Sequence, residues 1–228
     1  MTLIQPHFFP KEPVRKIVPG NRGVTGIVPL FGKYESTLER DLMEILRFDP
    51  DVEQFTPQPL TIDYLDREGH KHSYTPDGLI KFKASTSPFH LPILFEVKYR
   101  EDFRKDWKAL LPKFRAAKSY CMTQTWRFEV FTEREIRTPY LKNVKFLWQY
   151  LERIPEPAMM ARALEVLNDL DQADPDLLLC ALCNDTTNRA RFIPVIWHLI
   201  AIGAIGCDLN QPLTMRSLIQ TRGGCCNE

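Results

Sequence analysis

The sequence predicts an α/β chain in which a mixed first domain of order αβββαβ is followed by a smaller, mainly helical domain. Residues 52–98 and 126–132 break into short apolar and polar stretches, which is typical of strands. Residues 34–47 and 103–123 instead carry apolar residues at helical spacing. After residue 140 helical patterns remain and strand patterns do not. The second domain is therefore expected to be all-helical, or winged-helix-like by analogy.

The chain begins with a segment that predicts neither helix nor strand. Residues 1–30 contain five prolines and three glycines, and their charges are mostly positive. We expect an extended basic arm. The first helix follows over residues 34–47, where apolar residues recur at i, i+4, i+7 and i+8 from Leu38. Pro50 ends it, because a residue before proline is pushed out of the α region.

The next segment predicts a meander of antiparallel strands over residues 52–98, with a polar turn at 66–70. The continuous apolar run Ile93-Leu94-Phe95 indicates that its last strand is buried. A long helix over residues 103–123 contains Pro112, where it could kink or restart. A strand at residues 126–132 completes the first domain.

These elements predict four regions. They are the basic arm (1–30), the first domain (31–139), a connecting helix (140–155) and a helical carboxy-terminal domain for partner binding (156–228). The helices expected after residue 140 lie at about 141–153, 157–170, 174–183, 189–203 and 211–220.

Composition excludes several classes of protein. Hydrophobic residues make up 44% of the 228 residues and charged residues 26%, which excludes a disordered chain, a collagen and a small disulfide scaffold. The net charge of +1 hides an asymmetry: residues 1–155 hold 25 Lys and Arg against 20 Asp and Glu, and residues 156–228 hold 5 against 9. The first region is thus basic (+5) and the second acidic (−4). No secretory signal or membrane-spanning run is apparent, so we expect a cytoplasmic protein without a membrane partner.

The candidate chemistry lies at Pro76-Asp77 and at Glu96-Val97-Lys98. Glu96 and Lys98 are two positions apart on a strand, so both side chains project to one face. Carboxylates on neighbouring strands can hold Mg²⁺ or Mn²⁺, and a lysine beside them can orient or deprotonate a water or stabilise developing negative charge. The alternative interpretation is a surface Glu–Lys pair at a strand end, with Asp77 serving a turn.

Together these residues resemble the PD-(D/E)xK nuclease signature. In their context, YESTLERDLMEILRFDPDVEQFTPQP, HSYTPDGLIKF and FEVKYRED resemble the amino-terminal domain of TnsA, the endonuclease subunit of heteromeric cut-and-paste transposases. The resemblance covers residues 34–135 and implies a restriction-endonuclease-like core, a mixed sheet flanked by helices. The short chain is also similar to the TnsA proteins of transposons that carry CRISPR systems.

The resemblance implies a role for each matching residue. Glu39 matches the catalytic glutamate of the first helix, Asp77 the metal-binding aspartate, and Lys98 the motif lysine. Glu96 falls where many PD-(D/E)xK nucleases carry an acid, and the carbonyl of Val97 often completes the metal shell. Glu39 has an alternative role, because Ser36 to Glu39 also forms a capping-box pattern.

The resemblance also implies cofactor and partners. The cofactor would be Mg²⁺, with Mn²⁺ able to substitute, and the substrate the 5′ ends of transposon DNA in the bacterial cytoplasm. A TnsB-type transposase would cut and join the 3′ ends, and a TnsC-type AAA+ ATPase would contact the carboxy-terminal domain. Alternative functions are another PD-(D/E)xK nuclease, of restriction or junction-resolving type, or a catalytically inert module that binds DNA or an ATPase.

Two further groups of residues are candidates for binding. Eight Lys and Arg against three acids lie between Lys98 and Lys118, and of these Arg100 and Lys105 are the candidates for DNA phosphate contacts. His70 and His72 flank the predicted turn near Asp77. They could lie close to a metal, although solvated turn histidines are more common.

Overall fold

The structure, a computed structural model, describes residues 26–29, 31–66, 68–83 and 91–222. The chain divides between Arg137 and Thr138 into two compact units, unit 1 before the division and unit 2 after it. Residues 140–155, predicted as a separate connecting helix, lie in unit 2.

An antiparallel hairpin opens the described part of unit 1, where the sequence predicts the end of an extended arm. Its strands are β1 (Gly26–Val28) and β2 (Gly32–Tyr34). Val28 and Phe31 are almost fully buried in the core. Burial of their apolar surface outweighs the local effect of proline and glycine. The arm prediction is therefore corrected at residues 26–29, and residues 1–25 lie outside the described residues.

Helix α1 spans Thr37–Phe48, slightly later at its start than predicted. Ser36 is its N-cap, and the Ser36 hydroxyl accepts a hydrogen bond from the Glu39 amide over 3.1 Å. The helix begins here because this bond satisfies an amide that has no partner within the helix. Its end at Asp49, directly before Pro50, confirms the predicted stop.

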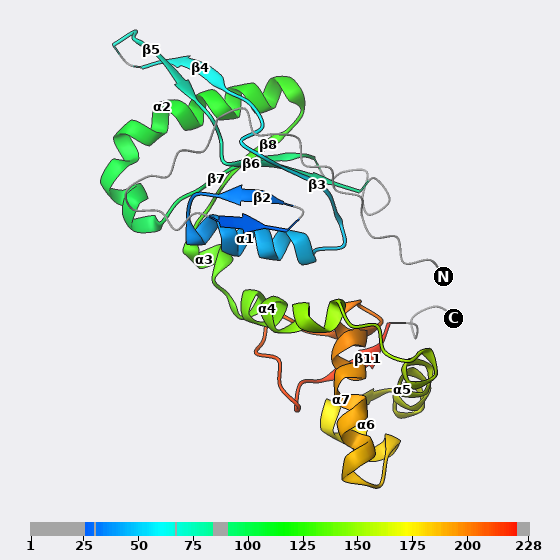
Figure 1. The fold of residues 1–228 in the computed structure, drawn as a ribbon. Coiled ribbons are helices and arrows are strands. Elements are labelled where there is room, and N and C mark those ends of the chain that lie inside the picture. Colours follow the sequence, from blue (N-terminus) through cyan, green and yellow to red (C-terminus); the bar gives the residue numbers. More distant parts are fainter. Residues whose placement is uncertain (1–25, 30, 67, 84–90, 223–228) are drawn as a thin grey trace. The chain divides into compact units, whose positions relative to one another are not determined.

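A four-stranded mixed sheet of order β3-β6-β7-β8 forms the centre of unit 1 (Figure 1). Its strands are β3 (Val52–Pro57), β6 (Gly78–Phe82), β7 (Ile93–Val97) and β8 (Arg127–Phe131). Neighbours are antiparallel except for β7 and β8, which run parallel and are joined by helix α2 (Arg100–Gln124). With α1, this gives the predicted αβββαβ order. Helix α2 continues through Pro112 and does not restart there.

Strands β4 (Ile62–Leu65) and β5 (Lys71–Tyr74) form a hairpin of their own. The predicted meander is corrected here, because β3 pairs with β6 across the sheet and not with β4. Figure 1 draws this hairpin projecting beside α2. Ile62 and Tyr74 pack into the apolar cluster that α2 covers, so the hairpin buries its apolar side chains against a helix.

The two faces of the sheet carry separate apolar clusters. Helix α1 covers one face, where Phe95 and Val97 of β7 point. Helix α2 covers the other face, where Leu94 of the same strand points. This alternation along β7 decides which active-site residues face which helix. The short helix α3 (Glu133–Ile136) closes unit 1 against α1.

Unit 2 contains four helices and a small sheet within its described residues. The helices are α4 (Pro139–Leu151), α5 (Pro157–Leu170), α6 (Pro175–Leu182) and α7 (Thr186–Ala201). They confirm the first four helices predicted after residue 140, with shifted ends. None of the helices in the described parts of the chain is long and apolar enough to cross a bilayer.

The sheet of unit 2 corrects the all-helical prediction. Strands β9 (Gln172–Ala173), β10 (Ile205–Cys207) and β11 (Ile219–Thr221) pair antiparallel in the order β10-β11-β9. The helix predicted at residues 211–220 is therefore wrong. Asn143 holds this segment extended, because its side chain donates to the carbonyls of Leu209 and Gln211 and accepts from the Leu213 amide.

Gly78, at the start of β6, provides a test of this packing. A Cβ on Gly78 would lie 2.5 Å from Cζ of Phe95, a buried ring with no room to move. We expect Gly78→Ala to lower the free energy of unfolding by about 1–3 kcal/mol through overpacking. Gly206→Ala in β10 is the control, because its Cβ would meet its neighbours at 3.5 Å, an ordinary contact. Thermal unfolding followed by circular dichroism measures both, and equal stability of the two variants would contradict the packing described.

Candidate active site

Asp77 lies in the turn before β6 and is fixed by backbone hydrogen bonds to β7. Its amide donates to the Phe95 carbonyl over 3.1 Å, and its carboxylate Oδ2 accepts from the Val97 amide over 2.7 Å. Its own carbonyl accepts from the amide of Gln58, at the end of β3. β7 thus positions the carboxylate, and the residue that follows β3 holds the backbone of Asp77.

The environment of Asp77 opposes its ionisation. Burial raises the pKa of this carboxyl well above its usual range, and the negative charges of Glu96 and Glu39 raise it further. The Val97 amide and the ammonium of Lys98 act in the opposite direction and do not cancel the effect. The four predicted catalytic side chains are therefore close enough to influence one another, and the charge of Lys98 does not offset that of the acids around Asp77.

Glu39 is held at the amino-terminal end of α1 by the bonds that its capping role requires. Its Oε1 accepts from the Ser36 hydroxyl over 2.8 Å and its Oε2 from the Glu35 amide over 2.9 Å. The capping-box prediction is thus met in part, because Ser36 caps the Glu39 amide but the Glu39 side chain accepts from the amide of Glu35 and not from that of Ser36. Burial raises the pKa of Glu39, although these two hydrogen bonds lower it.

Capping does not remove Glu39 from the site. Glu39 and Asp77 both line one small pocket between α1 and the sheet, which is partly open to solvent. The remaining lining residues are Lys33, Met43, Phe55, Pro57 and Phe95. Two carboxylates thus converge on one pocket, which is what a metal site on this face of the sheet needs.

Glu96 occupies the opposite face of β7, towards α2, and only 2% of its surface is exposed. Its Oε2 accepts from the Tyr74 hydroxyl over 2.7 Å, and its Oε1 lies 3.1 Å from Nζ of Lys113 and 3.5 Å from Nζ of Lys98. Both carboxylate oxygens therefore already have donors. Burial, followed by the charge of Glu96, raises the pKa of Tyr74, so this hydroxyl stays protonated and donates.

Lys113 and Tyr74 are members of the site that the sequence did not reveal. The ammonium of Lys113 lies 4.7 Å from the centroid of the Tyr74 ring, within the range of a cation–π interaction. The one available signal was a lysine next to the apolar stripe of α2, beside Phe114. Such a lysine usually keeps its charge in water. Only the packing of α2 on the sheet brings it to Glu96.

The ammonium of Lys98 is suited to stabilise negative charge. Burial disfavours its charged form, but Glu96, Asp77 and Glu39 together raise its pKa above the usual value. Lys98 is thus protonated near neutral pH and acts as a hydrogen-bond donor and not as a base. Its amide donates to the Phe131 carbonyl over 3.0 Å and fixes the backbone beyond the end of β7.

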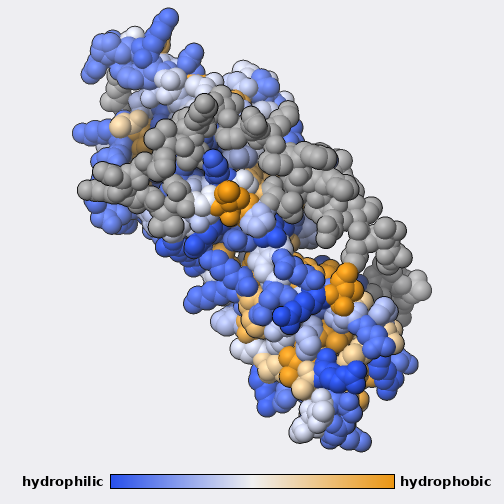
Figure 2. Space-filling model, in the orientation of Figure 1, coloured by the Kyte–Doolittle hydropathy of each residue, from blue (hydrophilic) through white to orange (hydrophobic). Residues whose placement is uncertain are grey.

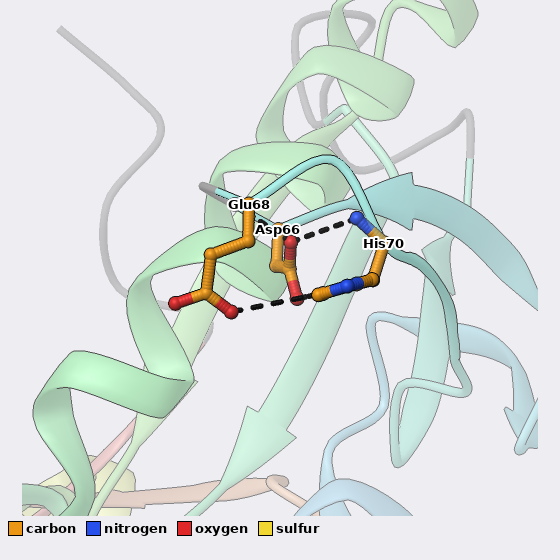
Figure 3. Close-up of side chains that lie close together, drawn as sticks. All are labelled: Asp66, Glu68 and His70. Carbon is orange, nitrogen blue, oxygen red and sulfur yellow. Dashed lines mark hydrogen bonds and ion pairs between the residues drawn. The ribbon is translucent and has the colours of Figure 1, made fainter.

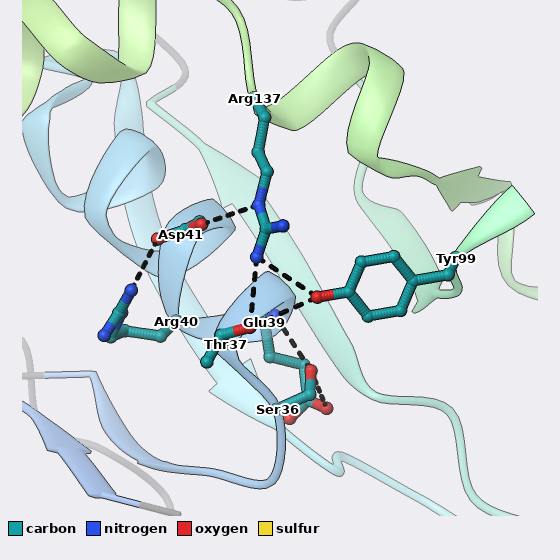
Figure 4. Close-up of polar contacts among 7 residues, drawn as sticks. All are labelled: Ser36, Thr37, Glu39, Arg40, Asp41, Tyr99 and Arg137. Atoms are coloured by element: carbon teal, nitrogen blue, oxygen red, sulfur yellow. Dashed lines mark hydrogen bonds and ion pairs between the residues drawn. The ribbon is translucent and has the colours of Figure 1, made fainter. Parts of the chain in front are cut away.

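A polar network fixes α1 against the far end of β7 (Figure 4). Arg137 Nε donates to the buried carboxylate of Asp41 over 3.0 Å, and Arg40 bonds the other oxygen of the same carboxylate. A terminal nitrogen of Arg137 donates to the hydroxyls of Thr37 and Tyr99. The network connects the helix that carries Glu39 with the residue after Lys98, so it helps to set their separation.

The two predicted phosphate-binding residues lie at the start of α2. Lys105 is exposed and forms an ion pair with Glu101 at 2.7 Å. The backbone amide of Arg100 donates to Glu133, and its side chain is exposed. Both side chains remain accessible to DNA, and Lys105 would exchange an acidic partner for a phosphate.

The donor set fits a hard divalent cation. Asp77 and Glu39 supply carboxylate oxygens to one pocket, and carboxylate oxygens are the ligands that such a cation prefers. Beside them, Oε1 of Gln58 is buried without a hydrogen-bond partner in the described structure. The oxygens of Glu39, Asp77 and Glu96 do not all lie within 4.8 Å of one another, in contrast to a cluster in the β4–β5 hairpin. Each of these acids is instead held by the donors named above.

Comparison with known proteins agrees with this geometry. Residues 49–133 match the family described as TnsA-like endonuclease N terminal. This part of the chain, less than half of its 228 residues, is thus similar to the TnsA-like endonuclease N-terminal domain. The match includes Asp77, Glu96 and Lys98 and begins after Glu39, whose assignment therefore rests on the shared pocket and on the resemblance. A search of curated proteins found no match.

Asp77→Asn is expected to stabilise unit 1 near neutral pH in the absence of divalent cations. The folded-state pKa of Asp77 is raised, so the folded protein binds more protons than the unfolded chain above the ordinary Asp pKa. The free energy of unfolding therefore falls as the pH rises from the ordinary Asp pKa through the raised pKa of Asp77. Asparagine does not titrate, so the variant does not undergo this fall. Urea unfolding at pH 5 and pH 8 in EDTA measures this effect. A variant that is less stable than the wild type at pH 8 would contradict it, and Asp106→Asn on the exposed face of α2 is the control.

Tyr74→Phe is expected to lower the free energy of unfolding by about 1.5–3 kcal/mol, because it removes a buried hydrogen bond to the charged Glu96. A double-mutant cycle with Glu96→Gln isolates this bond. The Tyr74→Phe loss should shrink in the Glu96→Gln background. Equal losses in the two backgrounds would mean that the hydroxyl and the carboxylate are not coupled.

Proposed function

We propose that this chain is the Mg²⁺-dependent endonuclease subunit of a heteromeric cut-and-paste transposase and cleaves the 5′ ends of the transposon. The observation that carries the proposal is the convergence of Asp77 and Glu39 on one pocket beside Lys98, within a TnsA-like endonuclease domain. The backbone of β7 holds the carboxylate of Asp77, because the Val97 amide donates to it.

Asp77 and Glu39 would hold the cation, with the carbonyl of Val97 as a further ligand. Bound Mg²⁺, or Mn²⁺ in its place, would lower the pKa of a bound water and neutralise charge on the scissile phosphate. Lys98 would donate to the phosphate or to the attacking water, since its raised pKa keeps it protonated. Glu96, anchored by Tyr74 and Lys113, would keep the ammonium of Lys98 in place.

Charge and exposure support the proposed partners. Arg100 and Lys105 would contact DNA phosphates beside the site.

In unit 2, large apolar side chains stand exposed, and Figure 2 displays hydrophobic residues on the drawn face of this unit. The exposed apolar side chains of unit 2 include Ile154 at 70%, Leu218 at 62% and Leu177 at 51% exposure. We propose that unit 2, winged-helix-like in the order of its helices and strands, binds a TnsC-type AAA+ ATPase, and that a TnsB-type transposase acts on the 3′ ends.

A reconstituted reaction tests the proposal. Transposon-end DNA is incubated with the chain, the partner transposase, the ATPase and Mg²⁺, and cleavage of each strand is scored separately. Asp77→Asn and Lys98→Met should each reduce 5′-strand cleavage at least about 10²-fold, because each removes stabilisation of the transition state. Joining of the 3′ strand should persist. Asp106→Asn controls for loss of a carboxylate, and undiminished 5′ cleavage by Asp77→Asn would overturn the site assignment.

The same reaction distinguishes the other functions. A restriction-type or junction-resolving nuclease would cut naked DNA without the transposase and the ATPase. An inert binding module would leave 5′ cleavage unchanged when this chain is omitted. Calorimetric titration with Mn²⁺ adds an independent measurement, since an inert module should bind no divalent cation in a way that depends on Asp77.

A further inference from the structure

A second cluster of metal-ligating side chains lies in the β4–β5 hairpin, outside the sheet that carries Asp77. Asp66, Glu68 and His70 each offer a ligand atom, and these atoms all lie within 4.8 Å of one another (Figure 3). His72 joins them through Asp66, because its Nε2 lies 2.8 Å from Asp66 Oδ2. Two imidazoles and two carboxylates thus gather at the end of one hairpin.

The hairpin fixes these residues before any ion arrives. Asp66 follows β4 and lies opposite His70, to whose carbonyl its amide donates. His70 and His72 are two positions apart along β5, so their side chains share one face. The ring of His72 also stacks on Tyr64, its cross-strand partner, with 5.5 Å between ring centroids. The ligands are therefore set by the register of the strands and not by a flexible loop alone.

The two carboxylate oxygens of Asp66 have different hydrogen-bond partners. Oδ1 accepts from the amides of Glu68 and His70 and holds the turn. Oδ2 faces the imidazoles and accepts from His70 Nδ1 over 3.2 Å and from His72 Nε2 over 2.8 Å. Oδ2 is thus the oxygen of Asp66 that both imidazoles contact.

The spacing matches that of a tetrahedral zinc site. Ligands about 2.0–2.1 Å from Zn²⁺ lie roughly 3.3 Å from each other in tetrahedral geometry. The distance from Asp66 Oδ2 to His70 Nδ1 is 3.2 Å, and that from His70 Nδ1 to Glu68 Oε2 is 3.6 Å. An ion could therefore replace the proton shared by Asp66 and His70 with little movement of Asp66, Glu68 and His70, whereas His72, which among these contacts only Asp66, would have to move towards the ion.

We propose that Asp66, Glu68, His70 and His72 form a site for a divalent transition-metal ion, with Zn²⁺ as the best match. Imidazole nitrogens favour Zn²⁺, Ni²⁺ or Cu²⁺ over Mg²⁺, so this site and the Asp77 pocket take different ions. The side chains of Glu68, His70 and His72 are 80%, 69% and 46% exposed, which leaves the site open to ions in solution. The bound ion would tie β4 to β5 beyond their backbone pairing.

Isothermal titration calorimetry with ZnCl₂ tests the proposal. The full chain is titrated in the presence of saturating Mg²⁺ and a phosphine reductant. The wild type should bind one Zn²⁺ ion, and this binding should require the side chains of the hairpin. His70→Gln combined with His72→Gln should weaken that binding at least about tenfold, because it removes two ligands and leaves the turn bonds of Asp66 intact. Asp63→Asn, a carboxylate on the exposed face of β4, is the matched control and should bind as the wild type does.

Two results would overturn the proposal. One is equal Zn²⁺ affinity and stoichiometry in the double histidine variant, which would place the ion elsewhere, for example at the exposed thiol of Cys180. The other is no Zn²⁺ binding by the wild type. Hydrogen exchange gives an independent readout. Zn²⁺ should slow exchange of the hairpin amides in the wild type and in Asp63→Asn, and leave it unchanged in the double histidine variant.

Discussion

The concentration of negative charge around one buried carboxylate, Asp77, is the constraint on which the arrangement of unit 1 depends. The Val97 amide fixes this carboxylate at 2.7 Å, and Glu96 and Glu39 lie close enough to raise its pKa. A fold optimised for stability alone would not bury such a group, because the desolvation of a charge is costly. The burial of Asp77 beside two other acids therefore marks this place as a candidate functional site.

The structure compensates for this negative charge, because each acid has its own hydrogen-bond donors. Glu39 is bonded through the cap of α1, and Glu96 is held by Tyr74 and Lys113 on the other face of β7. Both carboxylate oxygens of Glu96 thus have donors, and Oε1 lies near the ammonium groups of both Lys113 and Lys98. The acid on the motif strand and the acids of the pocket have different tasks, which a linear motif does not distinguish.

The two units use polar side chains in different ways. In unit 1, Arg137 and Asp41 connect α1 with the end of β7 and so support the geometry of the pocket. In unit 2, Asn143 holds a long segment extended and allows β11 to complete a sheet. Each is a side chain whose partners lie tens of residues away along the chain, and each determines a feature of the backbone.

The sequence by itself determined the elements with local causes: α1 and its stop at Pro50, the strands of the core, the long α2, and the pairing of Asp77 with Glu96 and Lys98 in one motif. Periodicity, capping and strand alternation act over a few residues, so a single sequence displays them. Tertiary structure decided the rest. The detached β4–β5 hairpin, the strands of unit 2, and the division of Glu96 and Asp77 between two faces depend on contacts distant in sequence. Lys113 joined the site for the same physical reason, because only packing of α2 brings its charge to Glu96.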